Sequence, residues 1–327
     1  MENRTKVAAI ILLLITMCHL CGNAQAQVTS LKFRIVGYVR EADVESGKAA
    51  TLDFSKVTHI NIAFINPDAL GNFSALPGLV AFTNLAHKND VRVLASLGGG
   101  LAPVYYSLLL SDNYRNDLIE NIVKLVVDYH LDGADIDLEG ERVDSNYELF
   151  VTGLSVALKR QGKMLTAAIA TVYKQQYPDK ALEVFDFVNI MSYDKTGPWR
   201  PSDPGQHSPY EMAVSDVDYW TNVRRIAKEK ISLGVPFYGY GFGPGVPQEI
   251  SYKSIIDKYP IAELADSARV AEGGTVYYNG IPTIDKKVHL ALAKAGGIMI
   301  WQLFQDAKGN YSLLNYIYDA VNGVIKQ

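Results

Sequence analysis

LDGADIDLEG, residues 131–140, places four acidic side chains in an otherwise apolar run. Carboxylates this close together repel one another, so folding alone does not favour the arrangement. The short apolar composition predicts a strand over 133–138. Because strand side chains alternate between two faces, Asp135, Asp137 and Glu139 point to the same side, about 6.6 Å apart at successive steps. The stretch therefore predicts a strand that carries a row of three carboxylates on one face.

Seven further runs share this length and apolar character. They are rich in Val and Ile and are closed by Gly, Pro or polar residues, as buried parallel strands are. With the opening run, the expected strands are 34–39, 59–65, 91–97, 133–138, 165–170, 187–191, 231–237 and 298–303. Helical patterns lie between them, so we expect an α/β fold, a closed (β/α)8 TIM barrel. An open doubly wound sheet is the alternative, but no G-x-G-x-x-G follows the first strand.

Amphipathic patterns predict the helices between these strands. Leu118, Ile122 and Val126 recur at helical spacing, and a second apolar stripe runs through 144–161. Ser215-Asp216-Val217-Asp218 has the form of a capping box, which predicts that a helix begins there.

The N-terminal residues have the pattern of an export signal. A basic start precedes the apolar run 7–17, and an A-x-A cleavage site ends at Ala26. Eleven helical residues rise only about 16 Å, too short to span a bilayer; an uncleaved membrane anchor is the alternative. We therefore expect a signal peptide over 1–26 and an exported protein, periplasmic or extracellular. Cleavage removes Cys18 and Cys21, the two cysteines of the chain, so no disulfide is expected.

Residues 27–327 are expected to form one domain. An α/β barrel typically needs about 250 residues, and the interval between the seventh and eighth strands is the longest in the chain. It has room for a helix at 288–294 and a small insertion at about 244–281. The formal net charge of −4 excludes a broad basic surface, so we expect no nucleic-acid partner.

The carboxylate row predicts acid–base chemistry at the barrel mouth. Active sites of such barrels lie at the C-terminal ends of the strands, so Glu139 is expected at the mouth. Neighbouring carboxyls raise at least one pKa in the row, and a carboxyl kept protonated near neutral pH is what a general acid needs. The stretch also has the start of a calcium loop, but Asn146 occupies the position of the required Glu. A purely structural acidic turn is the other alternative.

The motif D-G-x-D-x-D-x-E on a fourth barrel strand resembles glycoside hydrolase family 18, the chitinases and related endoglycosidases. Other stretches follow in the order of that family, and the resemblance covers residues 33–320. They are Val36-Gly37-Tyr38, Ala63-Phe64, Ser96-Leu97-Gly98-Gly99, Met191-Ser192-Tyr193-Asp194, Gly234-Val235-Pro236-Phe237-Tyr238-Gly239 and Trp301.

The resemblance implies four catalytic residues. Glu139 would protonate the glycosidic oxygen and later activate water. Asp137 would orient the 2-acetamido group of the substrate, and Asp135 would share a proton with Asp137. Tyr193 would hydrogen-bond the acetamido carbonyl.

The resemblance also implies residues that surround the sugar, with Trp301 as the floor under its ring. The expected substrate-binding set is Tyr38, Phe64, Gly98, Gly99, Met191, Asp194, Tyr240 and Trp301. Many chitinases have Arg where Tyr240 stands, so the charge on this side of the site differs. Outside the set, His207 is expected to be an exposed loop histidine, whereas Trp199 and Tyr210 are candidates for a sugar-stacking wall.

The implied reaction is retaining, substrate-assisted hydrolysis of β-1,4-N-acetylglucosaminide bonds in chitin or chito-oligosaccharides. Neither a metal nor another cofactor is implied. The expected partner is an oligo- or polysaccharide containing N-acetylglucosamine, with no membrane span in the mature chain and a monomeric state. The alternatives are an endo-β-N-acetylglucosaminidase of N-glycan cores, a non-catalytic chitin-binding lectin and a structural protein. Glu139 weighs against the lectin, because sugar-binding members of the family usually lose the acid.

Overall fold

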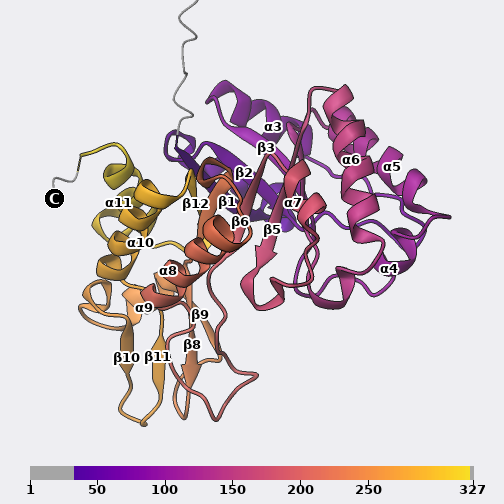
Figure 1. Ribbon diagram of the computed structural model, residues 1–327. Coiled ribbons are helices and arrows are strands. Elements are labelled where there is room, and N and C mark those ends of the chain that lie inside the picture. Colours follow the sequence, from indigo (N-terminus) through magenta and orange to yellow (C-terminus); the bar gives the residue numbers. More distant parts are fainter. Residues whose placement is uncertain (1–32, 325–327) are drawn as a thin grey trace, which may run out of the picture. The chain divides into compact units, whose positions relative to one another are not determined.

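The computed structural model describes residues 33–324, and eight strands in that range close into a parallel barrel (Figure 1). The order around the barrel is β1-β12-β7-β6-β5-β4-β3-β2. The barrel strands are β1 (Arg34–Arg40), β2 (His59–Ala63), β3 (Arg92–Gly98), β4 (Gly133–Asp137), β5 (Met164–Ala170), β6 (Phe187–Met191), β7 (Ile231–Pro236) and β12 (Gly297–Trp301). The closed barrel confirms the predicted TIM barrel. Its strands are the short apolar runs of the sequence, as expected for strands buried on both faces.

Helices of very different length lie between and after the strands. They are α2 (Glu41–Glu45), α3 (Leu79–Lys88), α4 (Tyr106–Leu109), α5 (Arg115–Asp128), α6 (Tyr147–Arg160), α7 (Asp179–Val184), α8 (Tyr210–Asp218), α9 (Tyr252–Lys258), α10 (Ile281–Lys294) and α11 (Leu313–Val321). Figure 1 shows α3 to α7 on one side of the barrel and α8, α10 and α11 on the other.

The predicted helix start at Ser215 is wrong. Ser215 lies inside α8, which begins at Tyr210 directly after the extended Pro209. The fixed φ of proline suits the residues that lead into a helix, and it overrides the weaker capping-box pattern. For the same reason α10 begins at Ile281, with a proline in its first turn, and not at 288.

Alternation along the strands separates two buried clusters. Ala134 and Ile136 of β4 point outward into the large core between barrel and helices. Tyr38 of β1 and Met299 of β12 point inward into a small cluster within the barrel. Burying a side chain such as Ile136 stabilises the fold by about 1.5–3 kcal/mol, so the register of β4 is fixed by its outer face. Its inner face is thereby free to carry polar groups.

The segment between β7 and β12 forms a second sheet. Its strands pair antiparallel in the order β10-β11-β8-β9, and α9 follows β9. The strands are β8 (Tyr238–Phe242), β9 (Glu249–Ser251), β10 (Ser267–Arg269) and β11 (Thr275–Tyr277). Figure 1 shows this sheet below the barrel, next to α9. Because β8 starts two residues after β7 ends, the sheet brings its side chains directly to the barrel mouth.

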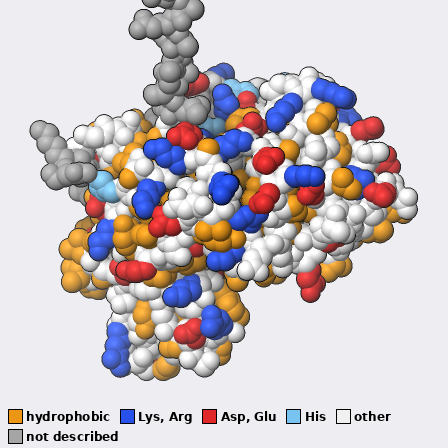
Figure 2. Space-filling view, viewed as in Figure 1, with side chains coloured by type: hydrophobic (Ala, Val, Ile, Leu, Met, Phe, Trp, Pro, Cys, Tyr) orange, Lys and Arg blue, Asp and Glu red, His pale blue; other side chains and the backbone are white. Residues whose placement is uncertain are grey.

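The surface in Figure 2 carries basic and acidic side chains interspersed with one another. In residues 33–324, no helix is long and apolar enough to cross a bilayer. The predicted signal peptide, 1–26, lies outside the described residues.

Candidate active site

The row of carboxylates lies on the inner wall of the barrel. Asp135 is fully buried on β4, and Asp137 at the end of this strand is 3% exposed. Glu139 lies just past the strand with extended backbone, φ −129° and ψ 154°, and its side chain is half-buried. The alternation of β4 therefore continues to Glu139, and the row runs from the barrel interior to its mouth.

Glycines let β3 and the chain after it pass close to this row. A Cβ at Gly98, where φ is +112°, would lie 2.2 Å from the carbonyl oxygen of Asp137. The amide of Gly99 donates a hydrogen bond of 2.7 Å to the same oxygen. A Cβ at Gly99 would lie 2.4 Å from the ring of Phe64. Both expected glycines are thus needed where the end of β3 packs against Asp137 and Phe64.

Asp135 accepts four hydrogen bonds from side chains of four other barrel strands, β1, β3, β5 and β6. The hydroxyls of Tyr38, Ser96 and Thr166 donate to it at 2.7, 2.8 and 2.6 Å. The amide of Asn189 donates at 3.4 Å. Ser96 and Thr166 are the register partners of Asp135 on the strands to either side. Burial raises the pKa of Asp135, and the donated hydrogen bonds oppose that rise because they favour the charged form.

Asp137 has a different environment from Asp135. Its Oδ1 is buried and has no hydrogen-bond partner among residues 33–324. Burial, followed by the charges of Glu139 and Asp135, raises the pKa of Asp137 well above its ordinary value. The two buried carboxyls thus differ, and the proton of the pair resides more favourably on Asp137.

Glu139 has the properties of a general acid. Burial, followed by the charge of Asp194, raises the pKa of Glu139 from its ordinary 4.5 to about 7. A carboxyl with this pKa is substantially protonated at neutral pH and can release the proton during a reaction.

Asp194 is held beside the mouth by side chains of β8. Its Oδ1 accepts hydrogen bonds from the hydroxyls of Tyr238 at 2.5 Å and Tyr240 at 3.1 Å. Its side chain remains 41% exposed. Tyr193, which precedes it, is buried and points its hydroxyl toward the sulfur of Met299 at 3.9 Å. The donors that reach Asp194 from β8 are thus phenolic hydroxyls.

The expectation that His207 is exposed is wrong. The residue is completely buried, and its ring packs against Tyr238 and Tyr240 with centroids 5.0 and 4.9 Å away. Its Nδ1 lies 3.3 Å from Oδ1 of Asp194. The aromatic rings of β8 shield the histidine from water, which its polar loop sequence did not indicate.

An aromatic floor lies between β1, β2 and β12. The ring of Trp301 stacks on Phe64 with centroids 5.5 Å apart, and its distance to Tyr38 is 5.4 Å. Met191 packs on the same inner cluster. The four expected residues are therefore contiguous, although Tyr38 is itself buried below the surface of the floor.

A cavity of about 390 Å³ lies at the barrel mouth. Glu139, Met191, Tyr193 and Asp194 line it together with residues of the loops that follow β5 and β6. The exposed Trp199, which precedes the lining residue Arg200, packs edge-on against Tyr240, 5.3 Å between centroids. The other candidate for a sugar-stacking wall, Tyr210, packs instead against the main core.

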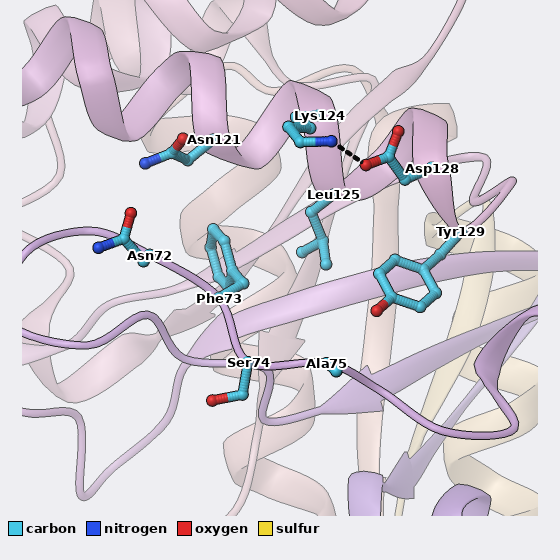
Figure 3. A pocket seen from close by; sticks show the side chains of 9 residues that line it. All are labelled: Asn72, Phe73, Ser74, Ala75, Asn121, Lys124, Leu125, Asp128 and Tyr129. Atoms are coloured by element: carbon cyan, nitrogen blue, oxygen red, sulfur yellow. Dashed lines mark hydrogen bonds and ion pairs between the residues drawn. The ribbon is translucent and has the colours of Figure 1, made fainter.

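A second cavity, of about 360 Å³, lies between the loop before α3 and helix α5 (Figure 3). Its two charged groups, Lys124 and Asp128, form an ion pair with each other. Asp128 is the one carboxylate among the residues that line this cavity, so the cavity holds no row of acids. The barrel mouth is therefore the candidate active site.

Several contributors to the site were missed in the sequence. Thr166 and Asn189 are polar residues at inward positions of otherwise apolar strands, and this signal was available. Tyr238 is close to an expected residue, Tyr240, and shares its face of β8.

We expect Tyr240→Phe to lower kcat/KM about tenfold, because it removes one hydrogen bond to a charged group. The Tyr238 hydroxyl still holds Asp194, so folding should be unchanged. Steady-state kinetics and a thermal melt measure the two effects. Tyr277→Phe, which alters the neighbouring strand opposite Tyr240, is the matched control. Equal losses in both variants would show that the bond to Asp194 has no special role.

Comparisons with known proteins agree with the barrel fold. The model of the family "Glycosyl hydrolases family 18" matches residues 34–306. The GH18 chitinase ChiB from the chitin utilization locus of Flavobacterium johnsoniae is 38% identical, with TM-score 0.81, over 90% of this chain and 96% of that one. A chitinase from Bacteroides thetaiotaomicron is 30% identical, with TM-score 0.78, over 88% and 96%. Human chitinase-3-like protein 2 is 22% identical over 68% of this chain and 72% of that protein.

Proposed function

Since the chain belongs to glycosyl hydrolase family 18, we propose that it is an active, exported glycosidase that hydrolyses β-1,4-N-acetylglucosaminide bonds in chitin or chito-oligosaccharides. The observation that carries this proposal is the carboxyl of Glu139. It lines a cavity at the barrel mouth, and burial and Asp194 raise its pKa to about 7. A site that only held sugar would need no proton donor of this kind.

The arrangement of carboxylates favours a nucleophile from the substrate. Ordinary retaining enzymes place two carboxyls about 5–5.5 Å apart on opposite sides of the bond. Here Asp135, Asp137 and Glu139 leave the same wall of the barrel, so they do not flank a bond from both sides. A further carboxylate, Asp194, is held toward β8 through two phenolic hydroxyls. The 2-acetamido oxygen of the sugar therefore serves as the nucleophile.

The reaction then has two balanced steps. Glu139 gives its proton to the glycosidic oxygen as the acetamido oxygen bonds to the anomeric carbon, and the leaving sugar departs with that proton. Asp137 passes its proton to Asp135, and the resulting carboxylate of Asp137 accepts a hydrogen bond from the acetamido N–H. Water next attacks the anomeric carbon, Glu139 takes the proton of this water, and the acetamide is restored.

Tyr193 and the aromatic floor hold the sugar for this reaction. Within residues 33–324, the hydroxyl of Tyr193 has only the weak acceptor sulfur of Met299 as its partner, so it can turn to the acetamido carbonyl. Trp301 and Phe64 offer a stacked apolar face for the ring. Proximity in such a pocket lowers the barrier because the nucleophile is already beside the reacting carbon.

A cleavage assay with two substrates tests the function. We expect the purified mature protein to cut chito-oligosaccharides and to leave a high-mannose glycoprotein intact. Chromatography of the products after timed incubation measures both. Cleavage of the glycoprotein alone would identify an endo-β-N-acetylglucosaminidase. Tight binding of chito-oligosaccharides with no cleavage, measured by calorimetry, would identify a lectin, and either result would overturn the proposal.

A further inference from the structure

Helix α10 carries a lysine that is completely buried. The ammonium of Lys287 donates hydrogen bonds to the carbonyl oxygen of Ser208 at 2.7 Å, to its hydroxyl at 2.6 Å and to Oδ1 of Asn279 at 2.7 Å. All three acceptors are neutral. A buried ammonium without a hydrogen-bonded carboxylate is unfavourable for folding. Burial correspondingly lowers the pKa of Lys287 to about 7, although nearby acidic residues oppose that effect.

The contacts of Lys287 converge on one short segment, His207-Ser208. The amide of Asn279 also donates to the Ser208 carbonyl, at 3.0 Å. Lys287 and Asn279 therefore hold Ser208 from the side of α10 and the residues before it. On its other side, away from α10, the His207-Ser208 segment contacts the residues around Asp194.

Backbone atoms join this segment to both sides of the pair Tyr193-Asp194. The hydroxyl of Ser208 donates to the carbonyl of Ser192 at 2.6 Å, just before the pair. The amide of Lys195, just after it, donates to the carbonyl of His207 at 2.9 Å. The strand end that presents the two expected site residues is thus tied down at both ends by His207-Ser208.

The imidazole of His207 completes the connection. Its Nε2 lies 3.3 Å from the carbonyl oxygen of Tyr238, which only accepts, so this nitrogen carries a hydrogen. Its Nδ1 contacts Asp194 at both the carboxylate, 3.3 Å, and the backbone amide, 3.5 Å. Asp194 has φ of +61°, a left-handed conformation that a non-glycine residue keeps only when its surroundings hold it there.

We propose that Lys287 is a positioning residue for Asp194, acting through the His207-Ser208 segment that it anchors. It touches neither substrate nor reacting atoms. The ammonium holds Ser208, Ser208 and His207 hold the backbone around Asp194, and the carboxylate of Asp194 is thereby kept beside Glu139. This inference deepens the proposed function and rests on it, because Asp194 matters only if Glu139 acts as the acid.

The variant Lys287→Met tests the proposal, because methionine has a similar length and no hydrogen-bond donor. We expect kcat to fall at least about tenfold, since small displacements of a site residue have effects of this size. KM should change much less. The charge of Asp194 contributes to the raised pKa of Glu139, so a displaced Asp194 should also move the alkaline limb of the rate profile to lower pH. A purely structural lysine would change neither quantity once the protein is folded.

Val288→Ala is the matched control. Val288 is the next residue of α10 and is also completely buried, so its truncation lowers stability without removing a polar contact. We expect this variant to melt at lower temperature with kcat near that of the parent. If Lys287→Met does not fold, Ser208→Ala decides, because it removes the hydroxyl that links Lys287 to Ser192. For Ser208→Ala we expect kcat to fall and the alkaline limb of the rate profile to move to lower pH, as in Lys287→Met, but by smaller amounts.

Crystal structures of the variants give a readout that does not need activity. We expect His207 and the Asp194 carboxylate to be displaced in Lys287→Met, or in Ser208→Ala, and to be undisplaced in Val288→Ala. An unmoved Asp194 with kcat within about twofold of the parent would overturn the proposal. If the parent protein cuts no glycan at all, the proposed function fails, and the crystal structures still decide whether Lys287 positions Asp194.

Discussion

Glu139→Gln should lower kcat on chito-oligosaccharides by at least about a hundredfold, the usual size of a general acid–base effect. The amide keeps the size of the side chain and most of its hydrogen bonding, but it has no proton to give to the glycosidic oxygen. Folding should survive, because the side chain is half-buried and the change removes repulsion from Asp137. Steady-state kinetics and a thermal melt measure the two effects. Glu141→Gln, an exposed acid two residues further along, is the control and should retain full activity.

The role of Glu139 as the acid also predicts how the activity of the parent protein depends on pH. Only protonated Glu139 can act as the acid, so kcat/KM should fall as the pH rises through about 7, the pKa to which burial and Asp194 raise this carboxyl. The raised pKa also means that the folded state binds more protons than the unfolded state between about 4.5 and 7. The parent protein therefore loses stability as the pH rises through that window, because the half-buried Glu139 becomes charged. Glutamine stays neutral, so Glu139→Gln should unfold at a higher temperature than the parent at pH 8. Near-normal activity of the variant would show that the acid lies elsewhere.

Fully deacetylated oligomers should be cut at least about a thousandfold more slowly than N-acetylated ones, because the attacking group is missing and proximity effects of this size or larger are lost. A glucosamine ring offers an ammonium, which cannot attack the anomeric carbon. Its charge also does not match a pocket in which Asp137 and Tyr193 hold a neutral amide.

Mixed oligomers supply the control for this substrate effect. In partly acetylated chains, cleavage should occur only where the sugar that contributes the anomeric carbon carries an N-acetyl group. Mass spectrometry of the product ends identifies that sugar. Ready cleavage next to glucosamine would exclude the acetamido oxygen as the nucleophile and would remove the roles given to Asp137 and Tyr193.

The barrel could be predicted because its strands are encoded locally. Strands buried on both faces are short runs of apolar residues, and the helices between them repeat at helical spacing. The row Asp135, Asp137 and Glu139 was equally visible, since residues two apart on a strand share a face. These features depend on neighbours in the chain, and a single sequence contains that information.

The partners of the row come from distant segments, and they were mostly missed. Thr166 reaches Asp135 because β5 pairs with β4 in one particular register, which the local sequence of neither strand specifies. His207 is buried because the rings of Tyr238 and Tyr240 cover it, although its loop is polar. Lys287 needs three acceptors from elsewhere in the chain to be buried at all. Such contacts depend on tertiary packing, which overrides local polarity.

Proton NMR of the first products is the most direct test of substrate-assisted hydrolysis at this site. Two displacements at one carbon, first by the acetamido oxygen and then by water, return the original configuration. Spectra of tetra-N-acetylchitotetraose recorded within the first minutes, before the anomers equilibrate, should therefore show β-anomers at the new reducing ends. Initial α-anomers would mean a single displacement by water, and they would contradict the mechanism and the positions assigned to Asp137, Glu139 and Tyr193 in it.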